Sequence, residues 1–261
     1  MIHARRYESG VTLIQIVIGL VIIGIVAGFA LMNASSKKAT IAKSEIAQLD
    51  KYKTAVADFK EKYSYLPGDI PAALVMQLKF VKRDGTPGRG DGNGQLEGYD
   101  YVNSKVADAF QSGEPLFFWE DLFSADMTKE PFNTAADSEL PNEVNSLNIA
   151  EYLPDAKIGG GNRLYAYGDG KANYIGISAV SKIEVTGTLT SKPGLTAKQA
   201  QEVDTKIDDG APSTGKVVAR YIDTQVQSAP AAQAASCYDA ASNHYAVAQA
   251  GQNCGLSFAM E

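Results

Sequence analysis

The stretch VTLIQIVIGLVIIGIVAGFALM, residues 11–32, determines how the rest of the chain is interpreted. Its residues are almost all apolar, and at about 1.5 Å per residue a helix of this length spans the hydrocarbon core of a bilayer. The run is too long for the apolar region of a cleaved secretory signal, which is usually about 7–15 residues. Arg5 and Arg6 precede it, which favours a cytoplasmic N-terminus. Gln15 interrupts the apolar run, and its presence there needs a reason.

After residue 32 the helical pattern continues but becomes amphipathic. Apolar residues recur at spacings of three, four or seven, and charged residues fill the faces between them. The apolar set is Ile46, Leu49, Val56, Phe59 and Tyr63. No proline interrupts residues 11–66. The pattern therefore predicts one long helix over residues 11–62, in which 11–32 suits lipid or other apolar helices and 33–62 packs against a sheet.

A short basic leader that ends in Gly10, then VTLIQ and a long helix, resembles the N-terminus of type IV pilins and type II secretion pseudopilins. The resemblance implies cleavage after Gly10 by a prepilin peptidase and methylation of the new N-terminal residue, Val11. It also implies filament assembly through the start of the mature helix, which includes Thr12, Leu13 and Gln15. Most members of the family carry glutamate where this chain has Gln15, and that glutamate is thought to pair with the terminal amine of a neighbouring subunit.

This resemblance gives an expected organisation for the whole chain. Residues 1–10 form the prepilin leader, residues 11–62 the helix, and residues 63–261 a periplasmic pilin-like head. The expected fold is α+β, with the long helix packed on an antiparallel β-sheet, large loops and a C-terminal disulfide loop. The precursor would sit in the inner membrane of a Gram-negative bacterium and then enter a pilus or pseudopilus. Because Gln15 carries no charge, a minor or tip position is expected.

A second hypothesis from another functional class stays open. The chain could be a single-span inner-membrane protein with a periplasmic ligand-binding domain. In that case it would keep residues 1–10 and would never polymerise, so N-terminal processing separates the two hypotheses.

Several local signals predict elements of the head. Pro67 ends the long helix, because the residue before a proline disfavours the α conformation. Residues 114–127 suit a short helix with Trp119 on its apolar face, packed on the sheet or in contact with another subunit. Asp169–Gly170 predicts the turn of a β-hairpin. Thr196 and Gln199 form a capping box for a helix that stops at Gly210, and residues 216–224 predict a further strand.

The only two cysteines are Cys237 and Cys254. No CxxC or Cys/His cluster accompanies them, which argues against a zinc site. In an exported domain they predict a disulfide, worth about 3 kcal/mol in the chain-entropy model. In a cytosolic protein they would be reduced, so this prediction depends on export.

Residues 83–100 form a glycine-rich loop that contains a calcium-like pattern. Its candidate ligands are the oxygens of Asp91, Asn93, Gln95 and Glu97, at alternate positions with glycines between some of them. Val102 stands where a calcium loop carries its last glutamate. A plain solvated turn explains the composition equally well, so both interpretations remain open and no other cofactor is expected.

Charge and residue types limit the remaining functions. Residues 63–261 hold 15 basic and 25 acidic residues, a net charge of −10, which argues against nucleic acid as a partner. The chain has only two histidines, and no nucleophile motif accompanies them. The sequence therefore predicts a protein that is not an enzyme and whose partners are the prepilin peptidase and other filament subunits.

Overall fold

The computed structural model describes residues 41–132, 144–223 and 236–260. The chain divides into two compact units, residues 1–43 and residues 44–261, and the second unit is described here by itself. The predicted cleavage and assembly residues, Gly10 to Leu13 and Gln15, lie outside the described residues. Within the described residues no helix has the length and apolar character needed to cross a membrane.

The head is an α+β structure, built on one face of the amphipathic helix. The described part of this helix covers residues 41–63. Leu49, Val56 and Phe59 of the predicted stripe are buried, and Tyr52 lies on the same face. The helix stops at Ser64, which has a positive φ of 66°, three residues before Pro67. The apolar stripe of residues 41–63 is thus mostly buried, as the periodicity predicts.

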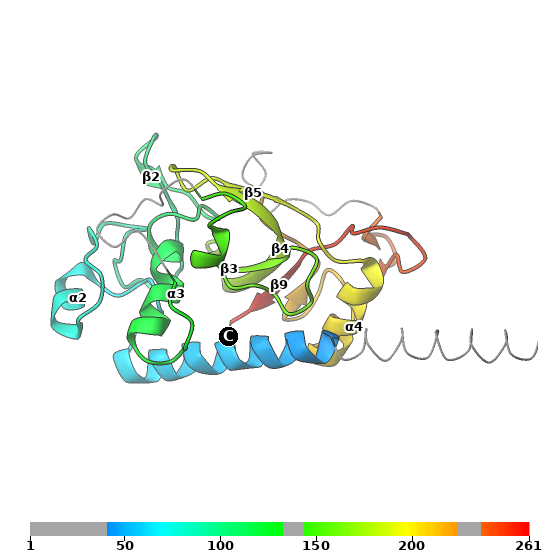
Figure 1. Ribbon diagram of the computed structural model, residues 1–261, viewed down its shortest axis with the longest axis horizontal. Coiled ribbons are helices and arrows are strands. Elements are labelled where there is room, and N and C mark those ends of the chain that lie inside the picture. The colour runs from blue at the N-terminus through cyan, green and yellow to red at the C-terminus, as the bar shows by residue number, and fades with distance from the viewer. Residues whose placement is uncertain (1–40, 133–143, 224–235, 261) are drawn as a thin grey trace, which may run out of the picture. The chain divides into compact units, whose positions relative to one another are not determined.

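A five-stranded antiparallel sheet forms the centre of the head (Figure 1). The strand order is β3 (Arg163–Gly168), β4 (Asn173–Ile183), β9 (Leu256–Ala259) and β6 (Val217–Val218), and β5 (Leu189–Lys192) pairs with the second half of β4. The predicted hairpin joins β3 to β4 with Tyr167 opposite Tyr174, and Gly170 in its turn has φ 75°. Two short hairpins, β1 (Tyr99–Asp100) with β2 (Lys105–Val106) and β7 (Tyr238–Asp239) with β8 (His244–Tyr245), lie outside the sheet.

The predicted strand over residues 216–224 is wrong in length. β6 contains only Val217 and Val218, and residue 224 lies outside the described residues. The chain leaves the sheet because the amide of Ala219 donates to the carbonyl of Pro212 at 2.7 Å rather than to a strand partner. The β-rich composition of this segment gave no sign of that turn.

Three helices and one short 3₁₀ turn, Ile149–Glu151, complete the described head. In α3 (Glu114–Ser124), Trp119 is buried and its ring lies 4.9 Å from that of Tyr52, so α3 packs on the long helix as well as on β3. α4 (Ala197–Ile207) begins with the predicted capping box: Gln199 N–H donates to Thr196 Oγ1 at 3.2 Å, and Thr196 N–H donates to Gln199 Oε1 at 2.9 Å. It ends at Ile207, three residues earlier than predicted. α2 is Ala72–Leu78.

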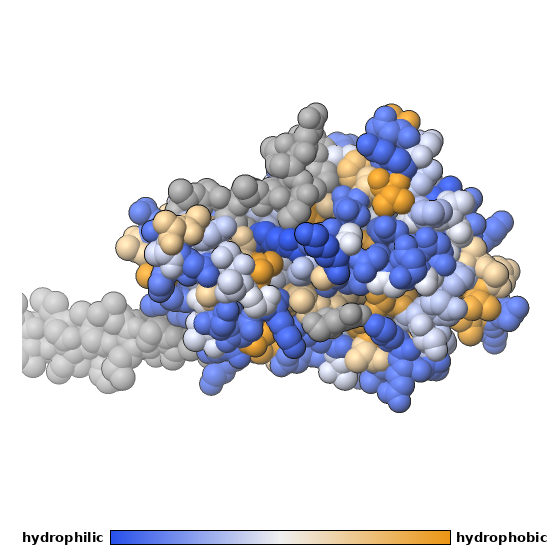
Figure 2. All heavy atoms as spheres, turned by 180° about the vertical axis from the view of Figure 1, so that it is seen from behind, coloured by the Kyte–Doolittle hydropathy of each residue, from blue (hydrophilic) through white to orange (hydrophobic). Residues whose placement is uncertain are grey.

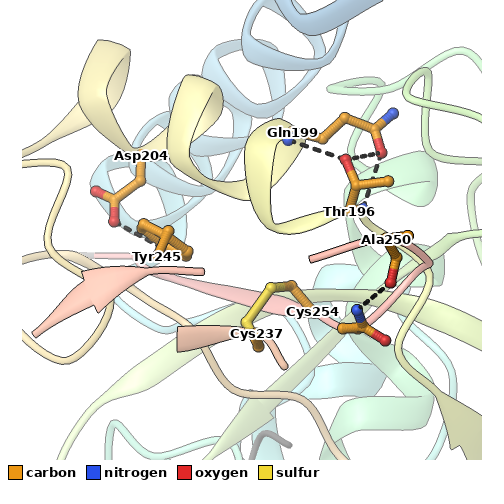
Figure 3. The surroundings of a disulfide bond; sticks show 8 residues. Thr196, Gln199, Asp204, Cys237, Tyr245, Ala250 and Cys254 are labelled. Carbon is orange, nitrogen blue, oxygen red and sulfur yellow. Dashed lines mark hydrogen bonds between the residues drawn. A yellow bond between two sulfur atoms is a disulfide. The ribbon is translucent and has the colours of Figure 1, made fainter. Parts of the chain in front are cut away.

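The predicted disulfide joins Cys237 to Cys254, and both residues are fully buried (Figure 3). It closes a loop that contains the β7–β8 hairpin. The carbonyl of Cys254 also accepts the amides of Gly194 and Leu195 at 3.0 and 2.9 Å. The loop is therefore fixed both covalently and by backbone bonds to the segment before α4.

Candidate functional site

The glycine-rich loop folds around two buried carboxylates that lie outside it in the sequence. Asp69, just after the end of the long helix, is fully buried. Its Oδ1 accepts the amide of Gly92 at 2.8 Å and its Oδ2 accepts the amide of Gly94 at 2.7 Å. Both carboxylate oxygens of Asp69 are thus bound by the loop backbone.

Glu114, the first residue of α3, holds the loop from the other side. It is also fully buried. Its Oε1 accepts the amide of Gly90 at 2.9 Å, and its Oε2 accepts the amide of Glu97 at 2.8 Å. The two acids together therefore receive four backbone N–H groups from a segment of eight residues.

The alternating glycines explain how one loop supplies these amides. Gly90, Gly92 and Gly94 have φ values of 80°, 79° and 86°, a region that residues with a side chain rarely adopt. Each donates its amide to Asp69 or Glu114. The spacing that resembles a calcium loop thus also serves to direct N–H groups at carboxylates.

The structure brings only part of the predicted calcium set into one cluster. One oxygen each of Asp69, Asp91 and Glu114 lies within 4.8 Å of the others. The side-chain amide of Asn93 instead donates to Glu97 Oε2 at 2.8 Å and to Asp91 Oδ2 at 3.2 Å. The side-chain oxygen of Gln95 is buried and has no hydrogen-bond partner among the described residues. We call Asp69, Asp91 and Glu114 the acidic cluster.

Burial and like charge shift the titration of the two inner acids. Burial raises the pKa of Asp69 to about 7, against the lowering effect of its hydrogen bonds from the loop. Burial, then the charge of Asp69, raises the pKa of Glu114 to about 9. The four N–H bonds favour the ionised forms, whereas burial and mutual repulsion favour the neutral ones.

A bound hard cation would let the carboxylates stay ionised, as their N–H bonds favour, and would also offset the cost of burial and the repulsion between them. Three carboxylate oxygens are the ligands that Ca²⁺ takes, and a full shell needs about three to five further oxygens. Calcium therefore stays a prediction, with Asp69 and Glu114 added to Asp91. The plain-turn alternative also stays, in which two neutral carboxyls accept the loop amides. Sequence reasoning missed Asp69 and Glu114 because they lie 23 and 24 residues from the amides of Gly92 and Gly90.

A buried ion pair fixes the position of Asp69. Arg83 Nη2 lies 2.8 Å from Asp121 Oδ1 on α3, and neither side chain is exposed. Arg83 Nη1 donates to the carbonyl of Gly68 at 2.8 Å, while the amide of Gly68 donates to Asp121 Oδ2 at 2.6 Å. Gly68, the residue before Asp69, is thereby held by both Arg83 and Asp121. The guanidinium of Arg83 is paired with the carboxylate of Asp121.

A second group of acids connects α4 to the disulfide loop. Oxygens of Asp204, Asp208 and Asp209 lie within 4.8 Å of one another. The hydroxyl of Tyr245 in β8 donates to Asp204 Oδ2 at 2.7 Å (Figure 3). Asp208 Oδ2 accepts the amide of Val217 at 3.1 Å. These bonds show what the acids do in the fold: they hold the 208–217 turn and the disulfide loop against α4.

A groove of about 560 Å³ lies beside the long helix, with residues 44–52 on one wall and residues 130–132 and 150–157 on the other. Lys51 crosses it to Glu130 at 3.2 Å. Elsewhere, the face in Figure 2 is mostly hydrophilic, with apolar residues in small separate groups.

Comparison with known proteins adds no relative. No family model matches this sequence, no curated protein matches it, and no solved structure matches the fold. The functional argument therefore depends on the residues and their geometry.

Proposed function

We propose that the chain is a structural subunit of a type IV pilus or of a type II secretion pseudopilus. Its precursor sits in the inner membrane with the head in the periplasm, a prepilin peptidase cleaves it after Gly10, and the mature chain assembles with other subunits through its N-terminal helix. The observation that carries the proposal is the change in the sequence pattern at about residue 33. The apolar run of residues 11–32 is followed by an amphipathic pattern, and Leu49, Val56 and Phe59 of its apolar stripe are buried in the head.

Three features of the described head support this proposal. One face of the described helix, residues 41–63, packs on a head that contains an antiparallel sheet, with Tyr52 of the helix against Trp119 of α3. The head has a net charge of −10 from residue 63 onward, which suits a surface in contact with water. A buried disulfide near the C-terminus suits an oxidising compartment.

Identifying the N-terminus of the native protein tests the proposal. Mass spectrometry of the mature chain is expected to show Val11 at the start, with a methyl group on its amine. A Gly10→Val variant is expected to keep the leader, whereas Gly19→Val, at a glycine inside the apolar run, should be cleaved normally. A native chain that begins at Met1 would instead support the single-span membrane protein with a ligand-binding head.

Gln15 bears on the position of the subunit within a filament. A buried charge needs a partner, and a glutamine accepts a hydrogen bond from a neighbour's amine without neutralising it. We therefore expect a minor or first-assembled position. Gln15→Glu is expected to raise the number of copies per filament, counted by immunogold labelling; an unchanged count would leave Gln15 as a passive polar substitute.

A further inference from the structure

The long helix carries one buried acid where it meets the head. Glu45 lies one turn before Leu49 on the buried stripe, and no part of it is exposed. Its Oε2 accepts the amide of Ile158 at 2.7 Å. Its Oε1 is buried and has no hydrogen-bond partner among the described residues. An ionised Glu45 would therefore place a half-satisfied charge in the interior, which is costly.

The next turn of the helix holds the same segment of the head without any charge. Gln48 Nε2 donates to the carbonyl of Asp155 at 2.9 Å, and Gln48 Oε1 accepts the amide of Lys157 at 3.0 Å. Residues 155–158 are thus held to the helix by three side-chain bonds. Of the two side chains that make them, only Glu45 titrates.

The groups that face Glu45 offer little compensation for its charge. Lys157, on the docked segment, attracts the ionised form, but it is exposed and water screens it. Tyr52, on the same helix, is buried and neutral, and burial raises the pKa of its hydroxyl to about 12. Burial has the largest effect on Glu45 and raises its pKa to about 7. The backbone hydrogen bonds from Ile158 and Lys157, and the positive charge of Lys157, lower the pKa but do not offset burial.

We propose that Glu45 is a pH-sensitive latch between the long helix and residues 155–158. The neutral carboxyl docks the segment, and ionisation of Glu45 releases it, because the released carboxylate reaches water while the docked one does not. This inference goes beyond filament assembly and does not depend on it, since it concerns contacts inside one head.

The expected size of the effect follows from linkage. The carboxyl of Glu45 has a pKa of about 7 when docked, and its ordinary value is 4.5. If the released carboxyl has the ordinary value, the equilibrium constant for release is about 25-fold larger at pH 8 than at pH 5.5. Docking is strongest below the ordinary pKa of 4.5 and weakens as pH rises through the docked pKa of about 7.

Hydrogen exchange on the full-length chain, held in detergent because of residues 11–32, measures this directly. After correction for the intrinsic rate, protection of peptides that cover residues 155–158 is expected to fall by about 25-fold from pH 5.5 to pH 8. Peptides from the centre of β4 report the pH dependence of the whole head, to which Asp69 and Glu114 also contribute. No loss of protection in residues 155–158 over this pH range would overturn the proposal.

Two variants on the same helix separate a latch from a merely structural acid. Glu45→Gln is a neutral mimic and is expected to keep the segment protected at both pH values. Glu61→Gln changes an exposed acid and should retain the full pH dependence. A pH-dependent loss of protection at residues 155–158 that is as large in Glu45→Gln as in the wild type would refute the latch. If that variant fails to fold, a wild-type chain whose residues 155–158 keep their full protection from pH 5.5 to pH 8 would still refute the latch.

Discussion

Replacement of Gly90 by alanine should destabilise the head much more than the same change at Gly94. Both glycines have a positive φ, 80° and 86°, so both substitutions incur backbone strain of about 1 kcal/mol. The difference lies in the space available. A Cβ at position 94 meets no atom within 4 Å, whereas at position 90 it meets the side chain of Arg83 and, at 2.8 Å, the carbonyl oxygen of Ile70.

Neither neighbour of Gly90 can move freely. Arg83 is fixed by its buried pair with Asp121, and the oxygen of Ile70 belongs to the backbone. The loop must therefore shift, which draws the amide of Gly90 away from Glu114 and leaves a buried carboxylate oxygen without its donor. That loss costs about 1–3 kcal/mol, so we expect a total of about 3 kcal/mol for Gly90→Ala and about 1 kcal/mol for Gly94→Ala.

Urea unfolding followed by tryptophan fluorescence measures the difference in the free energy of unfolding. Trp119 is the only tryptophan and is buried beside Tyr52, so its emission reports on the contact between α3 and the long helix. Equal losses of stability for the two variants would refute the reasoning, because strain alone would then account for both.

Three further predictions concern the acidic cluster and the disulfide loop. Without divalent cations, the stability of the head should fall as pH rises from about 4 to 9. In the folded chain the pKa values of Asp69 and Glu114 are raised to about 7 and 9, and the stability that the neutral carboxyls contribute is lost as each ionises. A urea midpoint that rises with pH would contradict this. Calcium at 100 times its dissociation constant should stabilise the chain at pH 8 by about 2.7 kcal/mol, and Asp69→Asn should abolish the effect; no shift in the wild-type midpoint would favour the plain turn. Tyr245→Phe should cost about 1–3 kcal/mol by leaving Oδ2 of buried Asp204 without its donor, whereas an unchanged midpoint would mean that water replaces the hydroxyl.

The parts of the head that the sequence predicts well are those fixed by near neighbours along the chain. The stripe through Leu49 and Phe59, the hairpin at Gly170 and the cap at Thr196 each depend on residues a few positions apart. The disulfide needed only the inference of export, because two cysteines allow one pairing. Local rules failed at β6, where a backbone bond from Ala219 to Pro212 turns the chain out of the sheet.

The acidic cluster shows why a site is harder to predict than an element. The sequence has alternating glycines at 90, 92 and 94, but their spacing does not say where their amides point. The acceptors Asp69 and Glu114 lie more than 20 residues away on either side and are brought together by the fold. A usable signal was present, since a glycine precedes each acid, Gly68 before Asp69 and Gly113 before Glu114.

The acidic cluster also indicates which experiment separates a structural turn from a cation site. Arg83 lies close to Asp69 through Gly68, yet its guanidinium is already paired with Asp121, so it does not neutralise the cluster. Two solutions remain for the buried acids: protons or a cation. Protons are lost as pH rises, whereas a cation binds more tightly as the acids ionise. The slope of stability against pH should therefore flatten when calcium is added if the cluster binds it, and stay unchanged if the carboxyls serve only to hold the loop.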